Sequence, residues 1–222
     1  MTTIVTFHSG SSGPVRWLSN LADAPLTLTW PESVVPRHMR GRTASYASSE
    51  HAYQALRSLN DRTAREFELG GSITMEVFRT WPVGKGVVVK DVYEQKHAYW
   101  GERKACRGIA AKMISNLAPS VAKEVFGLDL SPREGRPDGA LEAELLIWRP
   151  ILLAKFAQHP PMLQALLRTA PAALVEFGRF RNPTQYWSAF VDGPRLIGKN
   201  MMGRLVSAVR DELLAERALR EA

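Results

Sequence analysis

The sequence predicts a mainly α protein, a single multihelical domain over residues 1–222 with a small β element near the N-terminus. Hydrophobic residues make up 45% of the 222 residues, enough to bury a sizeable core. Apolar residues recur at helical spacing from residue 48 onward. Before that point, Gly, Ser and Pro alternate with short strand-like segments, and no internal repeat or low-complexity linker divides the chain.

Two short segments predict the β element. Residues 26–30, Leu-Thr-Leu-Thr-Trp, alternate apolar and polar side chains as a strand does, and Pro31 ends the pattern. We expect residues 4–7 to pair with this strand in a small sheet.

The first helix is expected to begin at Ser48 or Ser49, either of which suits an N-cap, and to run through Leu59. Its buried stripe consists of Ala52, Leu56 and Leu59. Glu50 and Gln54 lie one turn apart on a face away from that stripe.

Further helices are predicted over residues 62–69, 92–117, 119–126, 141–158, 161–167 and from 200 onward. Pro150 should kink or split the fourth of these. The last has Asn200 as its expected N-cap, and its apolar face comprises Met202, Leu205, Val206, Val209 and Leu213. Residues 172–177 suit a short helix or a strand, residues 81–91 a hairpin or a loop, and residues 127–139 a loop.

The charge balance favours anionic partners. The formal net charge is +7 and the isoelectric point is near 9.8. Arginines cluster at Arg37, Arg40 and Arg42 and again at Arg179 and Arg181, and guanidinium groups suit phosphate. A merely solvated basic surface explains the same pattern equally well.

The sequence does not fit several classes of protein. No apolar run reaches the roughly 20 residues that span a bilayer, and the first residues lack a secretory signal pattern, so no membrane partner is expected. A single cysteine, Cys106, excludes an internal disulfide and fits the cytoplasm. The five histidines lack metal-binding spacing, so we expect neither a metal nor a cofactor.

Glu50 is the first candidate for chemistry. A carboxylate in the first turn of a helix has its ionised form favoured by the helix dipole. A capping box would need Ser or Thr at position 47, which is Ala47, so that explanation is missing. Because Glu is common in first turns, the pattern by itself favours an ordinary surface residue.

Two other features have both a functional and an ordinary interpretation. The loop Gly198-Lys199-Asn200 enters a helix, where free N–H groups and the lysine suit a phosphate, but an Asn-capped helix explains it as well. Trp17, Trp148 and Trp187 suit stacking on a base, although core packing is the default for each.

Taken in order, these pieces resemble the NADAR (YbiA-like) family. The matching segments are Trp17-Leu18-Ser19-Asn20-Leu21, Ser49-Glu50-His51-Ala52-Tyr53-Gln54-Ala55, Leu153-Ala154-Lys155-Phe156-Ala157-Gln158-His159, Leu166-Leu167-Arg168-Thr169, Leu174-Val175-Glu176, Tyr186-Trp187, Gly198-Lys199-Asn200-Met201-Met202-Gly203 and Val209-Arg210. Residues 70–140 match poorly and are interpreted as a family-specific insert.

The resemblance implies a hydrolase of N-glycosidic bonds in phosphorylated ribosides. Two substrate classes follow from it: ADP-ribose attached to guanine in nucleic acid, and phosphoribosylamino-pyrimidine intermediates of riboflavin synthesis. It implies that Glu50 and Gln54 are catalytic, without a metal. It also implies contacts to substrate from Ser19, Asn20, Ser49, His51, Trp187, Gly198, Lys199 and Asn200.

One departure from the family pattern bears on activity. The family's Asp shortly before Tyr-Trp is absent from Asn182-Pro183-Thr184-Gln185, and Asp192 is the candidate for a displaced carboxylate. Two alternatives therefore stay open. In the first, the chain is a nucleotide- or nucleic-acid-binding module of the same fold without turnover. In the second, Glu50 is a structural residue bonded to a buried arginine. The oligomeric state is not predicted.

Overall fold

The computed structural model describes residues 3–8, 14–74, 108–131 and 141–221. The chain divides into two compact units. Unit 1 consists of Met1–Ser19 and Asp138–Ala222, and unit 2 of Asn20–Pro137. The predicted hairpin or loop at residues 81–91 and most of the helix predicted for residues 92–117 lie outside the described residues.

The described residues of unit 2 form a two-stranded sheet and four α-helices. Strands β2 (Leu26–Thr29) and β3 (Thr43–Tyr46) pair in antiparallel register, Leu26 opposite Tyr46. Tyr46 accepts a 2.8 Å hydrogen bond from the buried Trp30 indole, which fixes the core beneath the sheet. The helices are α1 (Ser49–Ala55), α2 (Asp61–Glu66), α5 (Gly108–Ser115) and α6 (Pro119–Phe126), and α1 packs against α5.

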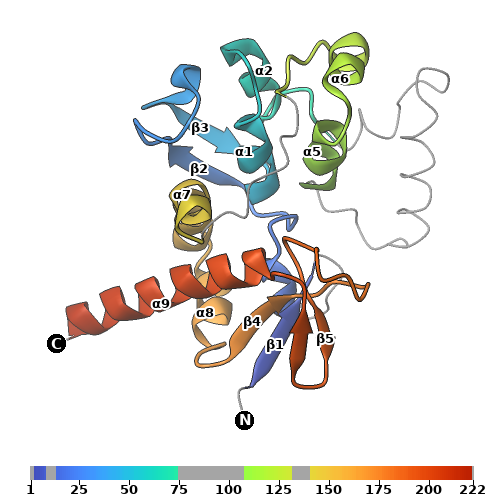
Figure 1. The fold of residues 1–222 in the computed structure, drawn as a ribbon. Helices are drawn as coiled ribbons and strands as arrows, with labels where there is room; N and C mark the ends of the chain where they lie inside the picture. The colour runs from blue at the N-terminus through green and yellow to red at the C-terminus, as the bar shows by residue number, and fades with distance from the viewer. Residues whose placement is uncertain (1–2, 9–13, 75–107, 132–140, 222) are drawn as a thin grey trace. The chain divides into compact units, whose positions relative to one another are not determined.

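Unit 1 combines helices with two further two-stranded sheets. Strands β1 (Ile4–Phe7) and β4 (Ala173–Glu176) are parallel, and β5 (Phe190–Asp192) and β6 (Arg195–Ile197) form a hairpin. Helices α7 (Leu141–Gln158), α8 (Pro160–Leu167) and α9 (Met201–Glu221) complete the unit. Helix α9 packs on β4 and α7 (Figure 1).

Close approach of α9 to β4 depends on Gly203. A Cβ built there would meet the Leu174 carbonyl oxygen at 2.3 Å and the Asn200 side chain at 2.4 Å. The buried face of α9 contains four of the five predicted residues, Met202, Leu205, Val206 and Val209, whereas Leu213 is half-buried.

The strand pairing differs from the prediction. Residues 4–7 pair with β4, about 170 residues away in sequence, rather than with residues 26–30. Sheet content is therefore not confined to the N-terminus, although helices are the commonest elements in the described part of the chain. Strands of three or four residues carry too little periodicity to reveal a distant partner.

The first helix is shorter than predicted. Helix α1 ends at Ala55 because the next residues pair with a distant segment: Leu59 donates its N–H to Asp129 at 2.9 Å, and Ser58 bridges Leu130. Leu59, predicted to be buried, is therefore 61% exposed. The 119–126 and 161–167 helices are confirmed, and α7 continues through Pro150 without splitting.

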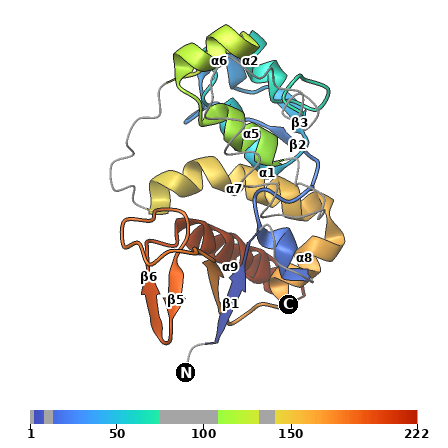
Figure 2. The same ribbon diagram turned by 90° about the vertical axis from the view of Figure 1, so that its right-hand side faces the viewer.

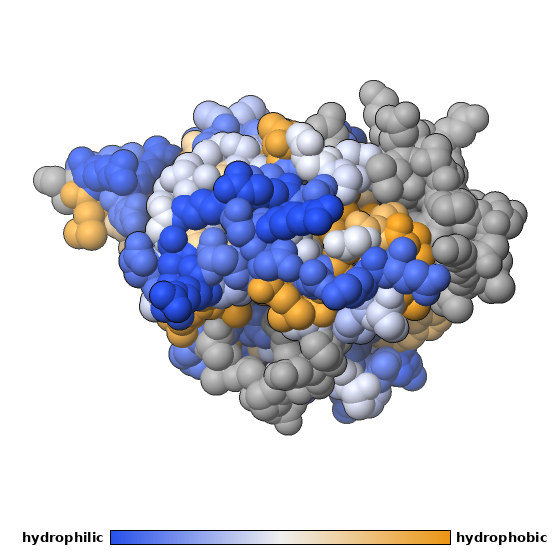
Figure 3. Space-filling view, turned by 90° about the horizontal axis from the view of Figure 1, so that it is seen from above, coloured by the Kyte–Doolittle hydropathy of each residue, from blue (hydrophilic) through white to orange (hydrophobic). Residues whose placement is uncertain are grey.

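One face of the molecule is largely hydrophilic. Figure 3 shows hydrophilic side chains over much of one face, with smaller hydrophobic patches between them. Among the described helices, none has the combination of length and apolar character that crossing a membrane requires.

Candidate active site

Glu50 is a buried carboxylate at the start of α1. Ser48 caps the helix, and its hydroxyl accepts from the His51 N–H at 3.4 Å. This cap places Glu50 in the first turn, with 3% of its surface exposed. Glu50 and Gln54, which lie away from the predicted stripe, are nevertheless buried, since every residue of α1 is buried. The helix is enclosed because α5, α2 and β3 pack around it.

Two side-chain amides hold the carboxylate. Gln54, one turn along, donates from Nε2 to Glu50 Oε1 at 2.7 Å, and Asn20 donates from Nδ2 to Glu50 Oε2. The Asn20 carbonyl also accepts from the Glu50 backbone N–H at 3.1 Å. Because amide N–H groups only donate, both carboxylate oxygens act as acceptors, the arrangement that suits an ionised group.

Two buried side-chain atoms of α1 lack a described hydrogen-bond partner. Ser49 Oγ and Gln54 Oε1 are buried and make no hydrogen bond to any residue that the structure describes. Because buried polar atoms in proteins are nearly always hydrogen-bonded, these two atoms are candidates for contact with a ligand. Since Gln54 Nε2 is committed to Glu50, Oε1 is left as an acceptor for a donor from outside.

His51, a predicted substrate contact, is used internally. Its Nδ1 lies 2.9 Å from the Ser48 hydroxyl and its Nε2 lies 3.1 Å from the Ile73 carbonyl oxygen. With both ring nitrogens engaged, His51 fixes the helix start to residue 73. The structure thus brings the side chains of Asn20, Glu50 and Gln54 together in unit 2, and Ser49 precedes Glu50 on the same helix.

The other predicted substrate contacts lie in unit 1, and two of them, Gly198 and Asn200, have structural roles. Gly198 has φ of 115°, and a Cβ there would meet the Ser188 carbonyl oxygen at 2.6 Å. The Asn200 amide donates to the Leu174 carbonyl at 2.8 Å and accepts from the Glu176 N–H at 3.0 Å. The predicted cap residue therefore ties the start of α9 to β4. Lys199, between them, is exposed.

Trp187 lies in an aromatic cluster. Its ring packs edge-on against the rings of Tyr186 and Trp148, with ring centres 5.0 Å and 5.9 Å away. Lys199 Nζ lies 5.9 Å from the Tyr186 ring centre. Tyr186 donates its hydroxyl hydrogen to Glu144 at 2.9 Å. Trp148 is core, as the default interpretation holds, and Trp187 is half-buried. Asp192 forms an ion pair with Arg181 on the surface.

Sequence reasoning missed Lys155. Its side chain is fully buried, and Nζ donates to the Ser19 carbonyl oxygen at 2.8 Å. Ser19, a predicted substrate contact, is itself fully buried and receives this bond. A buried ammonium is costly unless it is hydrogen-bonded. The available signal was a lysine within the apolar run of residues 151–157.

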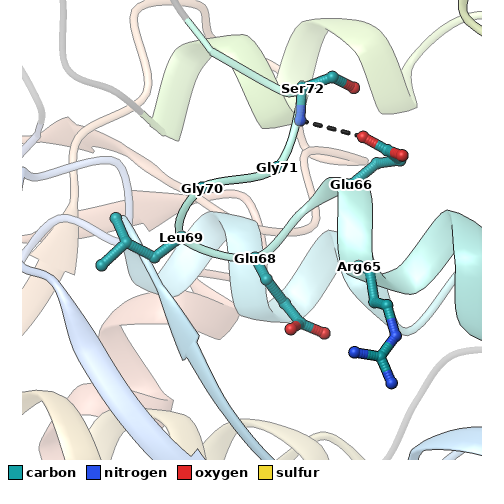
Figure 4. A pocket seen from close by; sticks show the side chains of 7 residues that line it. All are labelled: Arg65, Glu66, Glu68, Leu69, Gly70, Gly71 and Ser72. Atoms are coloured by element: carbon teal, nitrogen blue, oxygen red, sulfur yellow. Dashed lines mark hydrogen bonds between the residues drawn. The ribbon is translucent and has the colours of Figure 1, made fainter.

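A surface hollow elsewhere in unit 2 contains none of the predicted residues. It has a volume of about 520 Å³ and is lined by Arg65, Glu66, Glu68, Leu69, Gly70, Gly71 and Ser72 (Figure 4). Its loop is held by a 3.0 Å bond from the Ser72 N–H to Glu66. Residues 3–8, 14–74, 108–131 and 141–221 contain no cluster of three or more metal-ligating side chains, and His97 and Cys106 lie outside them.

Comparisons with known proteins find similarity to proteins of one name. No family model matches the chain. N-glycosidase YbiA of Escherichia coli strain K12 is 29% identical over 145 residues, 63% of this chain and 81% of that protein. Proteins of the same name from Shigella boydii and Shigella sonnei are 39% identical over 71 residues, 41% of their length. The NMR structure of E. coli YbiA has a TM-score of 0.54 at 23% identity, covering 98% of this chain and 88% of that one. The sequence matches and the similar fold support the resemblance of this chain to the YbiA-like (NADAR) family.

Proposed function

We propose that the chain is an N-glycosidase that hydrolyses the bond between a base and the sugar of a phosphorylated riboside. The buried Glu50 carboxylate, held by the amides of Asn20 and Gln54, is the observation that carries this proposal. Similarity to proteins named N-glycosidase YbiA supports it. The candidate substrates are ADP-ribosyl-guanine in nucleic acid and a phosphoribosylamino-pyrimidine.

Breaking a ribosyl C–N bond builds positive charge on the sugar, as in the oxocarbenium-like transition state of glycosidases. An ionised Glu50 beside C1′ stabilises that charge and accepts a proton from the attacking water. The bond from C1′ to the base nitrogen breaks, a bond from C1′ to the water oxygen forms, and the water proton ends on the leaving nitrogen.

The unpaired atoms beside Glu50 suit a sugar. Gln54 Oε1 accepts a hydrogen bond from a ribose hydroxyl or from the attacking water, and Ser49 Oγ offers a second polar contact. Asn20 acts as a positioning residue, because its amide bonds Glu50 directly. For Lys199 and Trp187 in unit 1, phosphate contact and base stacking stay predictions.

The test compares wild type with Glu50→Gln by liquid chromatography and mass detection of released base. The substrates are an ADP-ribosyl-guanine oligonucleotide and a phosphoribosylamino-pyrimidine, with NAD as a control compound. Glu142→Gln is the matched control variant, because Glu142 also lies in the first turn of a helix, α7, but is exposed. We expect Glu50→Gln to lose about 100-fold or more of turnover while binding substrate, and Glu142→Gln to retain it.

Failure of the wild type to release base from either riboside would overturn the proposal. Retained binding of ADP-ribose in that case would favour the binding module without turnover. A purely structural Glu50 predicts a different result: Glu50→Gln would lower the thermal midpoint well below that of Glu142→Gln, without a selective loss of turnover.

A further inference from the structure

An exposed aromatic side chain stands between two arginines in unit 1. The segment that follows β4 contains Arg179, Phe180 and Arg181, all exposed, and Phe180 has 74% of its surface in solvent. A large aromatic ring this exposed is unusual for a folded chain unless it serves in binding. The sequence analysis identified the two arginines, and the proposed hydrolysis does not use them.

The segment is anchored on both sides. Before it, the Gly178 N–H donates to the Ala189 carbonyl oxygen at 2.8 Å, which attaches it beside the β5–β6 hairpin. After it, the Asn182 side chain accepts from the Thr184 N–H at 3.0 Å and from the Thr184 hydroxyl at 2.8 Å. Phe180 therefore lies in a turn that has hydrogen bonds on both sides.

A third arginine comes from the hairpin. Arg181 is paired with Asp192, and Arg195 stands directly opposite Asp192 across the β5–β6 ladder. Directly opposed residues project from the same face of a hairpin. The hairpin stands at the edge of unit 1 (Figure 2). The Asp192 carboxylate is thus paired with Arg181 and lies across the ladder from Arg195. We call Arg179, Phe180, Arg181 and Arg195 the Arg179 surface.

His8 lies close enough to Arg179 to be affected by its positive charge. The pKa of His8 is lowered, first by partial burial and then by the charge of Arg179. The His8 ring also packs against Phe177 at 5.8 Å, next to the segment.

We propose that the Arg179 surface binds single-stranded nucleic acid, with Phe180 stacking on a base and the arginines contacting phosphates. Single strands are bound by grooves or faces that combine cationic side chains with aromatic rings, because unpaired bases expose their faces for stacking. The net charge of +7 attracts a polyanion at long range. An apolar protein partner that covered Phe180 would have to desolvate the exposed guanidinium groups of its neighbours Arg179 and Arg181, which disfavours that occupant.

The test measures fluorescence anisotropy of labelled 12-nucleotide single strands of DNA and RNA, titrated with the full chain over a series of salt concentrations. Phe180→Ala removes the ring and keeps the charge, and we expect it to weaken binding about 5- to 100-fold. The double variant Arg179→Gln with Arg181→Gln should reduce the slope of log affinity against log salt by about 0.7 for each phosphate that the protein no longer neutralises.

Helix α9 supplies the matched controls. Leu219→Ala removes an apolar side chain with 81% exposure, and Arg217→Gln removes one exposed arginine charge. Neither should change binding more than twofold. Equal weakening by the control variants, equal affinity for a duplex of the same length, or binding to phosphatidylserine vesicles but not to oligonucleotide would each overturn the proposal.

This inference concerns binding and goes beyond the proposed hydrolysis. Glu50→Gln should bind the oligonucleotide like wild type, and Phe180→Ala should retain hydrolysis of a small riboside. A wild type that binds single strands but hydrolyses no riboside overturns the proposed function alone. A wild type that hydrolyses a small riboside but binds no single strand overturns this inference alone.

Discussion

Gln54 donates a 2.7 Å hydrogen bond from Nε2 to Glu50 Oε1, one turn earlier on the same buried helix. This bond fixes which end of the Gln54 amide faces the carboxylate. The opposite end, Oε1, is buried and makes no hydrogen bond to a residue in the described part of the chain. One side chain therefore both holds the candidate catalytic group and offers an acceptor to a ligand.

Replacing Gln54 with leucine should lower both activity and stability. The variant removes one of two described donors to the Glu50 carboxylate, and a hydrogen bond to a charged group contributes about 1.5–3 kcal/mol. We expect the free energy of unfolding, measured with urea, to fall by about that amount and kcat to fall about 10-fold or more. Gln164→Leu, at an exposed position of α8, is the control. Wild-type kcat in Gln54→Leu would show that the amide does not support catalysis.

Substrates that lack a ribose hydroxyl should have a lower kcat/KM. If Gln54 Oε1 accepts that hydroxyl, a 2′-deoxy or 3′-deoxy analogue leaves the buried acceptor unpaired, which costs about 1–3 kcal/mol, or about 5- to 150-fold in kcat/KM. The measurement is kcat/KM for the riboside and both deoxy analogues. Wild type should discriminate and Gln54→Leu should not. Equal kcat/KM for all three substrates with wild type contradicts the assignment.

Gly203→Ala should destabilise the protein although alanine is the better helix former. Helix propensity by itself predicts a gain of about 1 kcal/mol. The added methyl group would overlap the Leu174 carbonyl oxygen, 2.3 Å away on the backbone, so α9 must shift from β4. Such overpacking costs about 1–3 kcal/mol. Thermal unfolding should show a lower midpoint than wild type, with Ser207→Ala on the same helix as control. A higher midpoint for Gly203→Ala would mean that α9 has room beside β4.

His38 should make stability depend on pH near neutrality. Burial lowers its pKa below 6.5, with Asp61 opposing and Arg42 adding to the shift. Its Nε2 is buried without a hydrogen-bond partner among the residues described. Because the unfolded chain takes up this proton first, the free energy of unfolding decreases as pH falls through 6.5 and levels off below the folded-state pKa.

The check is urea unfolding of wild type and His38→Gln between pH 7.5 and 5.5. Wild type should lose more stability over this range than the variant, which has no proton to take up at that position. Identical pH profiles for the two proteins would show that His38 keeps its ordinary pKa in the folded state.

Local sequence patterns predicted the helices whose start or buried face is marked by residues close together in the sequence. Proline at the first helical position marked α6 and α8, and the apolar spacing marked α9. The strand partners were not predictable in this way. Pairing of β1 with β4 and the early end of α1 both depend on contacts between residues far apart in sequence.

For the candidate site, the sequence predicted a helix start at Ser48 or Ser49 and the one-turn spacing of Glu50 and Gln54. It also supplied the resemblance to a family of N-glycosidases. Tertiary structure alone decided that α1 is enclosed, that Asn20 reaches Glu50, and that Lys155 is buried. Tertiary structure also gave Asn200 its contacts with β4. The physical reason is that spacing along a chain fixes which side chains share a helical face. Whether that face meets water, another helix or an amide from a distant loop is set by packing of the whole unit.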